Sequence, residues 1–547
     1  MIHNLKLIFH TVKYLKFIQI FNRIKRKFIK QNINILPSPK ISAISKLPQS
    51  FINCQSKMIG ENRFQFLNVT ADVNKADDWN LVNQDKLWLY NLHYFDDLNA
   101  IEATQRASWH ANLIERWIVE NPPGYGNGWE AYPSSLRIIN WIKWSLKGNS
   151  FKKEWFNSMA NQVRYLSNNL ETHLLGNHLF ANAKALVFAG LFFQGNESDG
   201  WYLTGLNIIE KELLEQVLPD GGNFELSPMY HSIFLSDLLD LVNIHETYNK
   251  KQISGVKDKI RLMLYWLKCM CHPDGGLSFF NDTALGIAPS LDELLDYAKR
   301  LSIKNISKKV EALEHLKNSG YIRVERENLV AMLDVANIGP DHIPGHGHAD
   351  ALSFELSLFG KRFIVNSGTS VYGTSPERHK QRSTLSHSTV VIDEQNSSEV
   401  WSGFRVARRA NVLNIKTKRN KNNIEISACQ DGYKRLKGKP IHKRHWNFFD
   451  NKIIINDIIT GKGTHSINSH LPLYPEVSIL NIQENSIEFE VKGKLVKIVF
   501  EGSGKLQVVS SQYHPEFGIS IDNKKLIYSY TGSLPFKGTT SIIWENY

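Results

Sequence analysis

The feature that most constrains the fold is a change in the spacing of apolar residues near residue 320. From about residue 84 to 315, apolar residues recur three and four positions apart, as in SSLRIINWIKWSLKG, HLFANAKALVFAGLFF and SIFLSDLLDLVNIHETY. This is the spacing of amphipathic helices. After about residue 320, apolar and polar residues alternate between short turns, as in YIRVERENLVAMLDV and LVKIVFEG, which is typical of antiparallel strands. The sequence therefore predicts an α+β multidomain protein with a helical domain followed by an antiparallel β-sandwich.

The length of 547 residues also requires more than one core. We expect an N-terminal segment and lead-in over residues 1–83, a helical domain over residues 84–318 and a β domain over residues 319–547. Within the helical part, PDGG occurs at 219–222 and again at 273–276. This spacing suits one helical hairpin per repeat, and stacked hairpins form a solenoid or a closed toroid. The crevice between two such domains is a preferred place for a site.

The positive charge of the chain is concentrated at its N-terminus. The formal net charge is +12, and the 60 residues before Glu61 hold 11 Lys and Arg but no Asp or Glu. The remainder is nearly neutral, so a nucleic-acid-binding role has no overall charge to support it. A preference for an acidic substrate must come from a local cluster.

The first 30 residues mix apolar and basic side chains at helical spacing. They lack the uninterrupted apolar stretch and the small-residue cleavage site of a secretory signal. We expect a basic amphipathic helix that either contacts an anionic membrane surface or packs on the body with its Lys outward. The four cysteines have no metal spacing and are too few for a disulfide framework. We expect a cytoplasmic location, with peripheral contact at the inner membrane face, and a periplasmic location as the alternative.

The segment PGHGHADALSFEL places His346, His348 and Asp350 at alternating positions. In an extended segment, alternating side chains share one face, so these three could point into one site. A polar strand edge would have the same pattern.

Three further segments carry polar residues where helical loops and early strands could meet. GNHLF holds Asn177 and His178 at the start of a predicted helix, where Asn could instead be a helix cap. DGGNFELSPMYH holds Glu225, Tyr230 and His231, and a Tyr there more often serves packing. RSTLSHSTVVID carries Arg382 and His387.

A fourth segment, GNGWEAYPSSLRIINWIKW, places Arg137 among Trp129, Tyr132 and Trp141. An Arg among aromatic rings can bind a sugar carboxylate while the rings stack on the sugar. A surface Arg that covers a Trp would have the same pattern.

Six motifs taken together are specific: GNHLFANAKAL, DGGNFELSPMYH, HPDGGLSFFND, HGHADALSFEL, VNSGT and LSHSTVVID. In this order, within residues 88–395, they resemble the heparinase II/III-like polysaccharide lyases, a family of alginate lyase and heparinase-like proteins. The resemblance implies an (α/α) toroid followed by an antiparallel β-sandwich. It also implies β-elimination on an acidic polysaccharide or oligosaccharide that contains uronic acid, without an organic cofactor.

The resemblance also assigns roles to individual residues. Asn177 matches the residue that neutralises the uronate carboxylate, with His178 or Arg137 as assistants. Tyr230 matches the Tyr that serves as base or acid, and His346 matches its partner on the β domain. Neutralisation is needed because the proton at C5 becomes acidic only when the carboxylate charge is offset.

A metal site is implied by the same resemblance. His348 and His387 match zinc ligands of the zinc-containing members, but Asn366 stands where those members have Asp. Asn is neutral and a poorer zinc ligand than a carboxylate. We therefore expect either a Zn²⁺ site at these three residues or a hydrogen-bonded structural cluster.

The leading prediction is thus a lyase linked to bacterial surface polysaccharide. A non-lyase enzyme or glycan-binding protein of capsule or O-antigen synthesis on the same scaffold is one alternative. A glycoside hydrolase, with Glu225 and Asp282 as its carboxylates, is the other.

Overall fold

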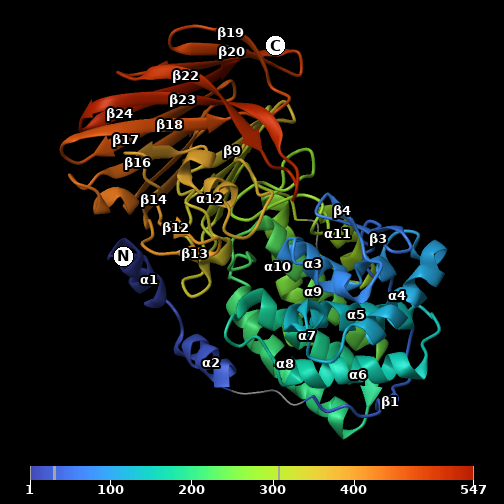
Figure 1. Ribbon diagram of the computed structural model, residues 1–547. Coiled ribbons are helices and arrows are strands. Elements are labelled where there is room, and N and C mark those ends of the chain that lie inside the picture. Colours follow the sequence, from blue (N-terminus) through green and yellow to red (C-terminus); the bar gives the residue numbers. More distant parts are fainter. Residues whose placement is uncertain (1, 29–32, 306–307, 546–547) are drawn as a thin grey trace.

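The computed structural model describes residues 2–28, 33–305 and 308–545. A helical domain and a β domain lie side by side, and two N-terminal helices lie at their junction (Figure 1). The first, α1 (Ile2–Val12), packs on the β domain, and the second, α2 (Phe17–Phe28), follows at a short turn. Residues 1, 29 and 30 of the predicted N-terminal segment lie outside the described residues.

The helical domain consists of antiparallel helices arranged as an (α/α) toroid, as predicted. The three quoted helical segments fall in α5, α7 and α9. Ser227 caps α9, and a capping box at Ser290 starts α11. The helices are α3 (Lys86–Tyr94), α4 (Ala107–Glu120), α5 (Ala131–Leu146), α6 (Lys153–Ser167), α7 (Gly176–Phe192), α8 (Asn196–Gln216), α9 (Pro228–Thr247), α10 (Val256–Cys269) and α11 (Leu291–Arg300).

The two PDGG segments form the same kind of turn, one after α8 and the other after α10. The first lies inside the antiparallel bridge from Val217 to Asn223, and the second inside the bridge from Cys271 to Leu277. In both turns the Asp side chain accepts a hydrogen bond from the last Gly N–H. The predicted repeat is therefore present in the structure.

The lead-in belongs to the helical domain. Phe51, Phe64 and Trp79 are buried in the same core as the helices. A short sheet covers this side of the domain, and β1 (Lys40–Ile41) pairs with β5 (Phe193–Gln194). The strands of the short sheet are β2 (Met58–Gly60), β3 (Arg63–Phe66) and β4 (Val69–Asp72).

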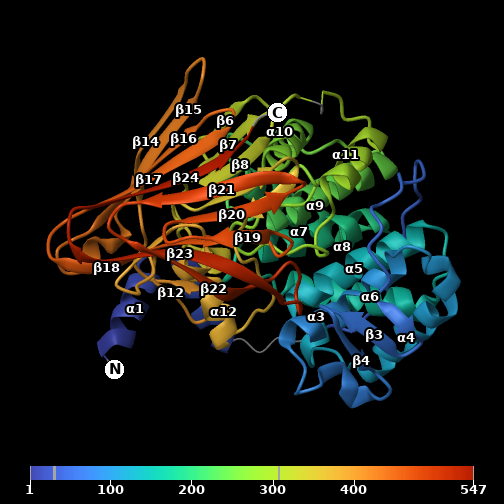
Figure 2. The same ribbon diagram turned by 90° about the horizontal axis from the view of Figure 1, so that it is seen from above.

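The β domain stacks antiparallel sheets, as Figure 2 shows from above. Their strand orders are β10-β9-β8-β7-β6, β11-β18-β23-β22 and β14-β15-β16-β17-β24-β21-β20-β19. A short helix, α12 (Pro376–Gln381), and the hairpin β12-β13 lie beside them. The strands are β6 (Leu313–Leu316), β7 (Tyr321–Arg326), β8 (Leu329–Asp334), β9 (Phe354–Leu358), β10 (Lys361–Ile364), β11 (Val390–Ile392), β12 (Val400–Trp401), β13 (Arg405–Val406), β14 (Val412–Arg419), β15 (Ile424–Gln430), β16 (Ile441–Phe448), β17 (Lys452–Thr460), β18 (Thr464–Pro472), β19 (Ser478–Ile482), β20 (Ser486–Val491), β21 (Lys494–Glu501), β22 (Lys505–Tyr513), β23 (Ile521–Ser533) and β24 (Phe536–Trp544).

The predicted domain boundary at residues 318 and 319 falls inside a hairpin. Leu316 of β6 pairs with Tyr321 of β7, and Gly320 takes the left-handed conformation that the tight turn requires. The β domain therefore begins at β6, a few residues earlier than predicted. Four residues of alternation are too few to distinguish from the end of a helical stretch.

An apolar cluster joins the two domains. Leu226, Trp266 and Phe280 from the helical side pack with Tyr321 and Met332 of the β domain, and all five are buried. The Tyr321 hydroxyl also donates to the Leu226 carbonyl at 2.7 Å. The loops that follow these residues are consequently held in fixed positions at the junction.

Among the residues that the structure describes, none of the helices combines the length and the apolar character needed to cross a bilayer.

Candidate active site

Asn177 lies in the first turn of α7 and lines a pocket with Glu225 and Tyr230. The preceding Leu175 and Gly176 both have positive φ, so the chain turns sharply into the helix. The Asn177 backbone N–H donates to Glu225 Oε1 at 3.3 Å. Its side-chain amide makes no hydrogen bond within the described part of the chain, and its Oδ1 is buried. Asn177 therefore does not cap α7 through its side chain, and its amide is free to bind a ligand.

Tyr230 lies in the first turn of α9, and its position is fixed by Ser227. Ser227 Oγ accepts the Tyr230 backbone N–H at 3.2 Å and donates to the Asp282 carbonyl at 2.6 Å. The Tyr230 hydroxyl lies 2.9 Å from that of Tyr372. Burial raises the pKa of the Tyr230 hydroxyl well above its usual range, and Tyr372 adds to the shift. Tyr230 is therefore protonated at neutral pH.

His346 comes from the β domain and stacks on the Tyr230 ring, with ring centroids 3.9 Å apart. Its Nδ1 lies 2.8 Å from Asp282 Oδ2, and its Nε2 lies 3.4 Å from Glu225 Oε2. An imidazole whose Nδ1–H donates to a carboxylate presents Nε2 as its free nitrogen. The structure therefore brings Asn177, Tyr230 and His346 together.

Asp282 is fully buried and binds both guanidinium nitrogens of Arg378. Although burial alone would raise its pKa, Arg378, His346 and His348 hold the pKa of the Asp282 carboxyl well below its usual range. Because the Asp282 side chain is fully buried and its oxygens accept from Arg378, His346 and His348, it orients the histidines and is closed off from a glycan. It cannot serve as a glycosidase carboxylate.

The Glu225 carboxyl lies between Asn177 and His346 and contacts both of them. It lines a pocket with Tyr132, Asn177 and Tyr230. Burial raises the pKa of Glu225, and the facing His346 and the Asn177 N–H offset this only in part. A protonated Glu225 would donate a hydrogen bond to an anionic ligand instead of repelling it.

His178 lies beside this pocket and packs against Tyr132, with ring centroids 4.5 Å apart and the ring planes tilted by 39°. Its Nδ1 is 3.1 Å from Glu171 Oε1. Burial alone would lower the pKa of His178, but the ion pair with Glu171 outweighs it and raises the pKa. The shift favours the protonated form of His178, which is paired with Glu171 beside Asn177.

The predicted metal ligands His348 and His387 lie together. His348 Nδ1 and His387 Nε2 are 3.3 Å apart. Two ligand atoms of one tetrahedral zinc are separated by a similar distance, about 3.3 Å. Burial lowers the pKa of His348 to about 4, and its Nε2 lies 2.9 Å from Asp282. A neutral His348 that donates from Nε2 has a lone pair on Nδ1, as a metal ligand needs.

Asn366 does not complete this set. Its Oδ1 accepts the Ser388 backbone N–H at 3.2 Å, and its Nδ2 is buried without a partner. Within the described ranges, no three His, Cys, Asp or Glu side chains are grouped so that they could hold a metal. Two imidazoles therefore fit a zinc ion, whereas a third, charged ligand is missing.

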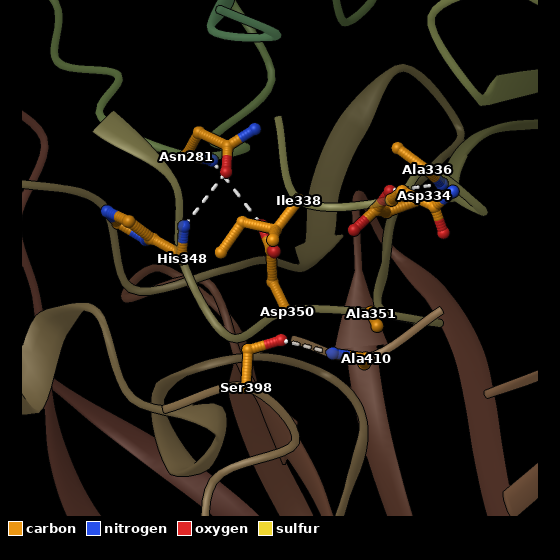
Figure 3. A pocket seen from close by; sticks show the side chains of 10 residues that line it. Asn281, Asp334, Ala336, Ile338, His348, Asp350, Ala351, Ser398 and Ala410 are labelled. Atoms are coloured by element: carbon orange, nitrogen blue, oxygen red, sulfur yellow. Dashed lines mark hydrogen bonds between the residues drawn. The ribbon is translucent and has the colours of Figure 1, made fainter. Parts of the chain in front are cut away.

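The expectation that His346, His348 and Asp350 share one site is wrong for Asp350. The segment is not extended, because Pro344–His346 form a short 3₁₀ helix. Both histidines bind Asp282. Asp350 does not bind it: its carboxylate accepts the Asn281 N–H at 3.4 Å, and it lines a small cavity together with Asp334 and His348 (Figure 3).

The predicted substrate contacts of Arg137, Trp129 and Trp141 are also wrong. All three are buried in the helical core. Arg137 donates to the carbonyls of His93 and Gly128, and its guanidinium lies 3.8 Å from the centroid of the Trp117 ring. Its donors are therefore used within the domain.

Arg382 and His231 likewise serve the scaffold. Arg382 donates to the carbonyls of Gly347 and Gly403 and is fully buried. His231 Nε2 donates to the Met263 carbonyl, and the ring stacks on a buried Trp266. Of the predicted substrate contacts, His178, Tyr132 and Glu225 remain at the site.

Tyr372 and Arg378 were not predicted. Tyr372 bonds Tyr230, and the Arg378 guanidinium lies 4.9 Å from the centroid of the Tyr372 ring while it neutralises Asp282. The sequence holds one relevant signal, since Ser375 followed by Pro376 is a typical helix start. A helix there puts Arg378 and Arg382 on one face.

Two family models match the chain. Heparinase II/III N-terminus matches residues 102–300, and Heparinase II/III-like, C-terminal, matches residues 308–545. Together they cover the helical domain from near the start of α4 and nearly all of the β domain.

Individual proteins show the same likeness. A heparin-sulfate lyase from Bacteroides stercoris is 28% identical over 335 residues, which are 57% of this chain and 47% of that protein. A heparin-sulfate lyase from Pedobacter heparinus is 25% identical over 363 residues, which are 59% and 50%. This chain thus spans about half the length of these curated relatives. A crystal structure of Heparinase III has a TM-score of 0.68 at 17% identity and covers 88% of this chain and 79% of its own, which shows the shared fold.

Proposed function

Because the chain belongs to the heparinase II/III-like family, we propose that it is a polysaccharide lyase that cleaves a uronic-acid glycan by β-elimination. The observation that carries the proposal is the stack of Tyr230 on His346 across the domain junction, next to the free amide of Asn177. The relatives named heparin-sulfate lyases support an acidic, glycosaminoglycan-like substrate.

Neutralisation of the uronate carboxylate is assigned to Asn177. Its unbonded amide can donate to the carboxylate, and such a donor is worth most when the charge shifts into the ring in the transition state. Two neighbours support this donor: burial raises the pKa of Glu225, which lessens its repulsion of an anion, and the ion pair with Glu171 raises the pKa of His178.

Proton transfer is assigned to His346 and Tyr230. His346 takes the C5 proton at Nε2, while its Nδ1–H donates to Asp282. The C4–O bond then breaks, a C4–C5 double bond forms, and the Tyr230 hydroxyl protonates the departing oxygen. The raised pKa of Tyr230 keeps that proton available.

Zinc binding is part of the proposal, with a supporting role. His348 and His387 would hold the ion, with Asn366 as a weak third ligand or a water in its place. Bound zinc would supply a fixed anchor for the loop that carries His346. The chain's own residues carry every step of the elimination, and no organic cofactor is required.

Contact with an anionic membrane surface through residues 1–30 also belongs to the proposal, with a cytoplasmic location at the inner membrane face. Phe17, Phe21 and Ile24 follow one another on α2 at helical spacing, and each is about half or more exposed. Leu5, Phe9 and Val12 form a second exposed apolar stripe, on α1. Apolar stripes flanked only by basic charge suit an anionic lipid surface.

The proposed reaction is tested by the mass of its products. The protein is incubated with heparan sulfate, unsulfated heparosan, alginate and hyaluronan, and the fragments are weighed by mass spectrometry. Elimination gives fragments whose masses sum to that of the substrate. Fragments that together carry one added water per cut would instead mean hydrolysis.

A further inference from the structure

Gln19 of α2 is buried between the two domains. Only 1% of its surface is exposed, although its helix lies on the outside of the molecule. Its side-chain Nε2 donates to the Leu174 carbonyl at 3.4 Å and to the His342 carbonyl at 3.2 Å. Its Oε1 accepts the Lys16 backbone N–H at 2.9 Å. One amide group therefore joins a loop of the helical domain to a loop of the β domain.

Both of these loops lead directly into the site. Leu174 precedes Asn177 by three residues, and His342 precedes His346 by four. The loops also touch each other, because a Cβ on Gly176 would lie 3.1 Å from Ile343 Cδ1. Gln19 thus ties together the two segments that carry the carboxylate donor and the proton acceptor.

The rest of the N-terminal segment is anchored on both domains as well. Arg26 of α2 bonds the His173 imidazole of the helical domain at 2.8 Å. On the other side, Trp401 Nε1 of the β domain donates to Thr11 Oγ1 of α1 at 3.1 Å. Figure 1 shows α1 beside β12 and β13 and α2 near α8. The two helices therefore bridge the junction.

The part of the chain that the two family models match begins at residue 102, so this bridge lies outside it. We propose that α1 and α2 form a clasp across the domain junction and that Gln19 is a positioning residue of the active site. Through its two hydrogen bonds, Gln19 sets the separation between Asn177 and His346.

This inference rests on the proposed function, in which one sugar ring is bound by Asn177 and deprotonated by His346. The two groups come from different domains, so their separation depends on how the domains meet. A displacement of about 1 Å in such a constellation can lower the rate about 100-fold. A clasp at the back of the two loops limits that displacement.

The experiment compares Gln19→Leu with Asn22→Leu in the full chain. Asn22 lies on the same helix, and among the described residues its side chain makes no hydrogen bond, so its variant controls for the loss of an amide from α2. For each variant, hydrogen exchange is measured over residues 171–179 and 340–348, together with kcat and KM on the cleaved glycan.

Gln19→Leu should speed exchange in both loops and lower kcat about tenfold or more with KM changed much less, because positioning acts on the reacting geometry. Asn22→Leu should match the unaltered protein in every measurement. Exchange and kcat in Gln19→Leu equal to those in Asn22→Leu would overturn the proposal. Hydrogen exchange tests whether Gln19 holds the two loops even when none of the glycans is cleaved. A wrong clasp proposal can therefore be told apart from a wrong lyase assignment.

Discussion

The rings of Tyr230 and His346 stack with centroids 3.9 Å apart, although Tyr230 belongs to a helix of the toroid and His346 to a loop of the β domain. The proposed active site therefore needs side chains from both domains and forms only where the domains meet. Each of the following predictions tests one group at or near that junction.

Tyr230→Phe should lower kcat by about 100-fold or more, because it removes the proton donor for the leaving oxygen. The aromatic ring and its stack on His346 remain, so the melting temperature and KM should change little. Tyr372→Phe is the matched control, since it removes the hydroxyl that faces Tyr230 at 2.9 Å without removing the acid. An equal loss in both variants would argue that the pair acts as a unit.

Asn177→Ala should lower kcat by about 100-fold or more, on the scale of losing one oxyanion donor. Its side chain makes no hydrogen bond within the described residues, so stability should be nearly unchanged. Asn177→Asp should be at least as damaging, because it places a negative charge against the substrate carboxylate. Steady-state kinetics and thermal unfolding of the three proteins separate these effects. Normal turnover in Asn177→Asp would contradict the assigned role.

Asp282→Asn should destabilise the protein at neutral pH by about 3–5 kcal/mol, because it leaves a buried Arg378 without its charge partner. The pKa of Asp282 is held well below its usual range in the folded protein. Its contribution is therefore present above the unfolded pKa of about 3.9 and is lost as the pH falls through the folded pKa.

Denaturant unfolding at pH 7 and at about pH 3 checks this prediction. The difference in the free energy of unfolding between the unaltered protein and Asp282→Asn should be smaller at about pH 3 than at pH 7. Asp296→Asn, at an exposed residue paired with Lys299, is the control and should change stability little at either pH. A difference that is larger at about pH 3 would contradict the prediction that acid removes the stabilisation by Asp282.

Asn366→Asp should raise the zinc content of the purified protein, because a carboxylate supplies the charged ligand that His348 and His387 lack. Elemental analysis after dialysis against zinc measures the change. His348→Ala in the same background should abolish it. Zinc content that is equal in all three proteins would leave these residues a hydrogen-bonded structural cluster.

Replacing Phe17 and Phe21 by Ser should reduce binding to anionic vesicles, because both side chains lie on the outer stripe of α2, 80% and 52% exposed. The control replaces Leu203 and Leu214 of α8, which are similarly exposed but lie outside the stripe. Sedimentation with vesicles that contain phosphatidylserine measures binding. Binding should also fall with salt, since each basic residue near the surface contributes about 1 kcal/mol of screened attraction. Equal binding by both double variants would exclude the stripe as the contact.

The sequence was sufficient where local spacing decides the structure. The long helices α5, α7 and α9 and the two PDGG turns follow from periodicity and turn chemistry, and the motif order gave the fold family. It was insufficient where tertiary packing decides. Arg137 among aromatic rings has the same local pattern in a core as at a sugar site, and only its buried carbonyl partners identify it as part of the core.

The partners of the histidines could not be predicted for the same reason. Asp282 lies about 90 residues before the segment that holds Tyr372 and Arg378, and the two segments meet only in the folded protein. Alternation at residues 346, 348 and 350 predicts one shared face, whereas Pro344–His346 form a 3₁₀ helix and Asp350 bonds the Asn281 N–H instead of Asp282. Gln19 carries no signal in the sequence, since its role depends on two carbonyls more than 150 residues away.

The most direct test of the central claim is the ultraviolet absorbance of the unsaturated uronate that only elimination produces. The unaltered protein, Tyr230→Phe and His346→Ala are each incubated with the glycan panel, and absorbance is followed with time. The account predicts a steady rise with the unaltered protein on at least one uronate glycan and a rise about 100-fold or more slower with each variant. Equal rises with all three proteins would contradict the assignment of the site, and new reducing ends without absorbance would contradict the lyase reaction itself.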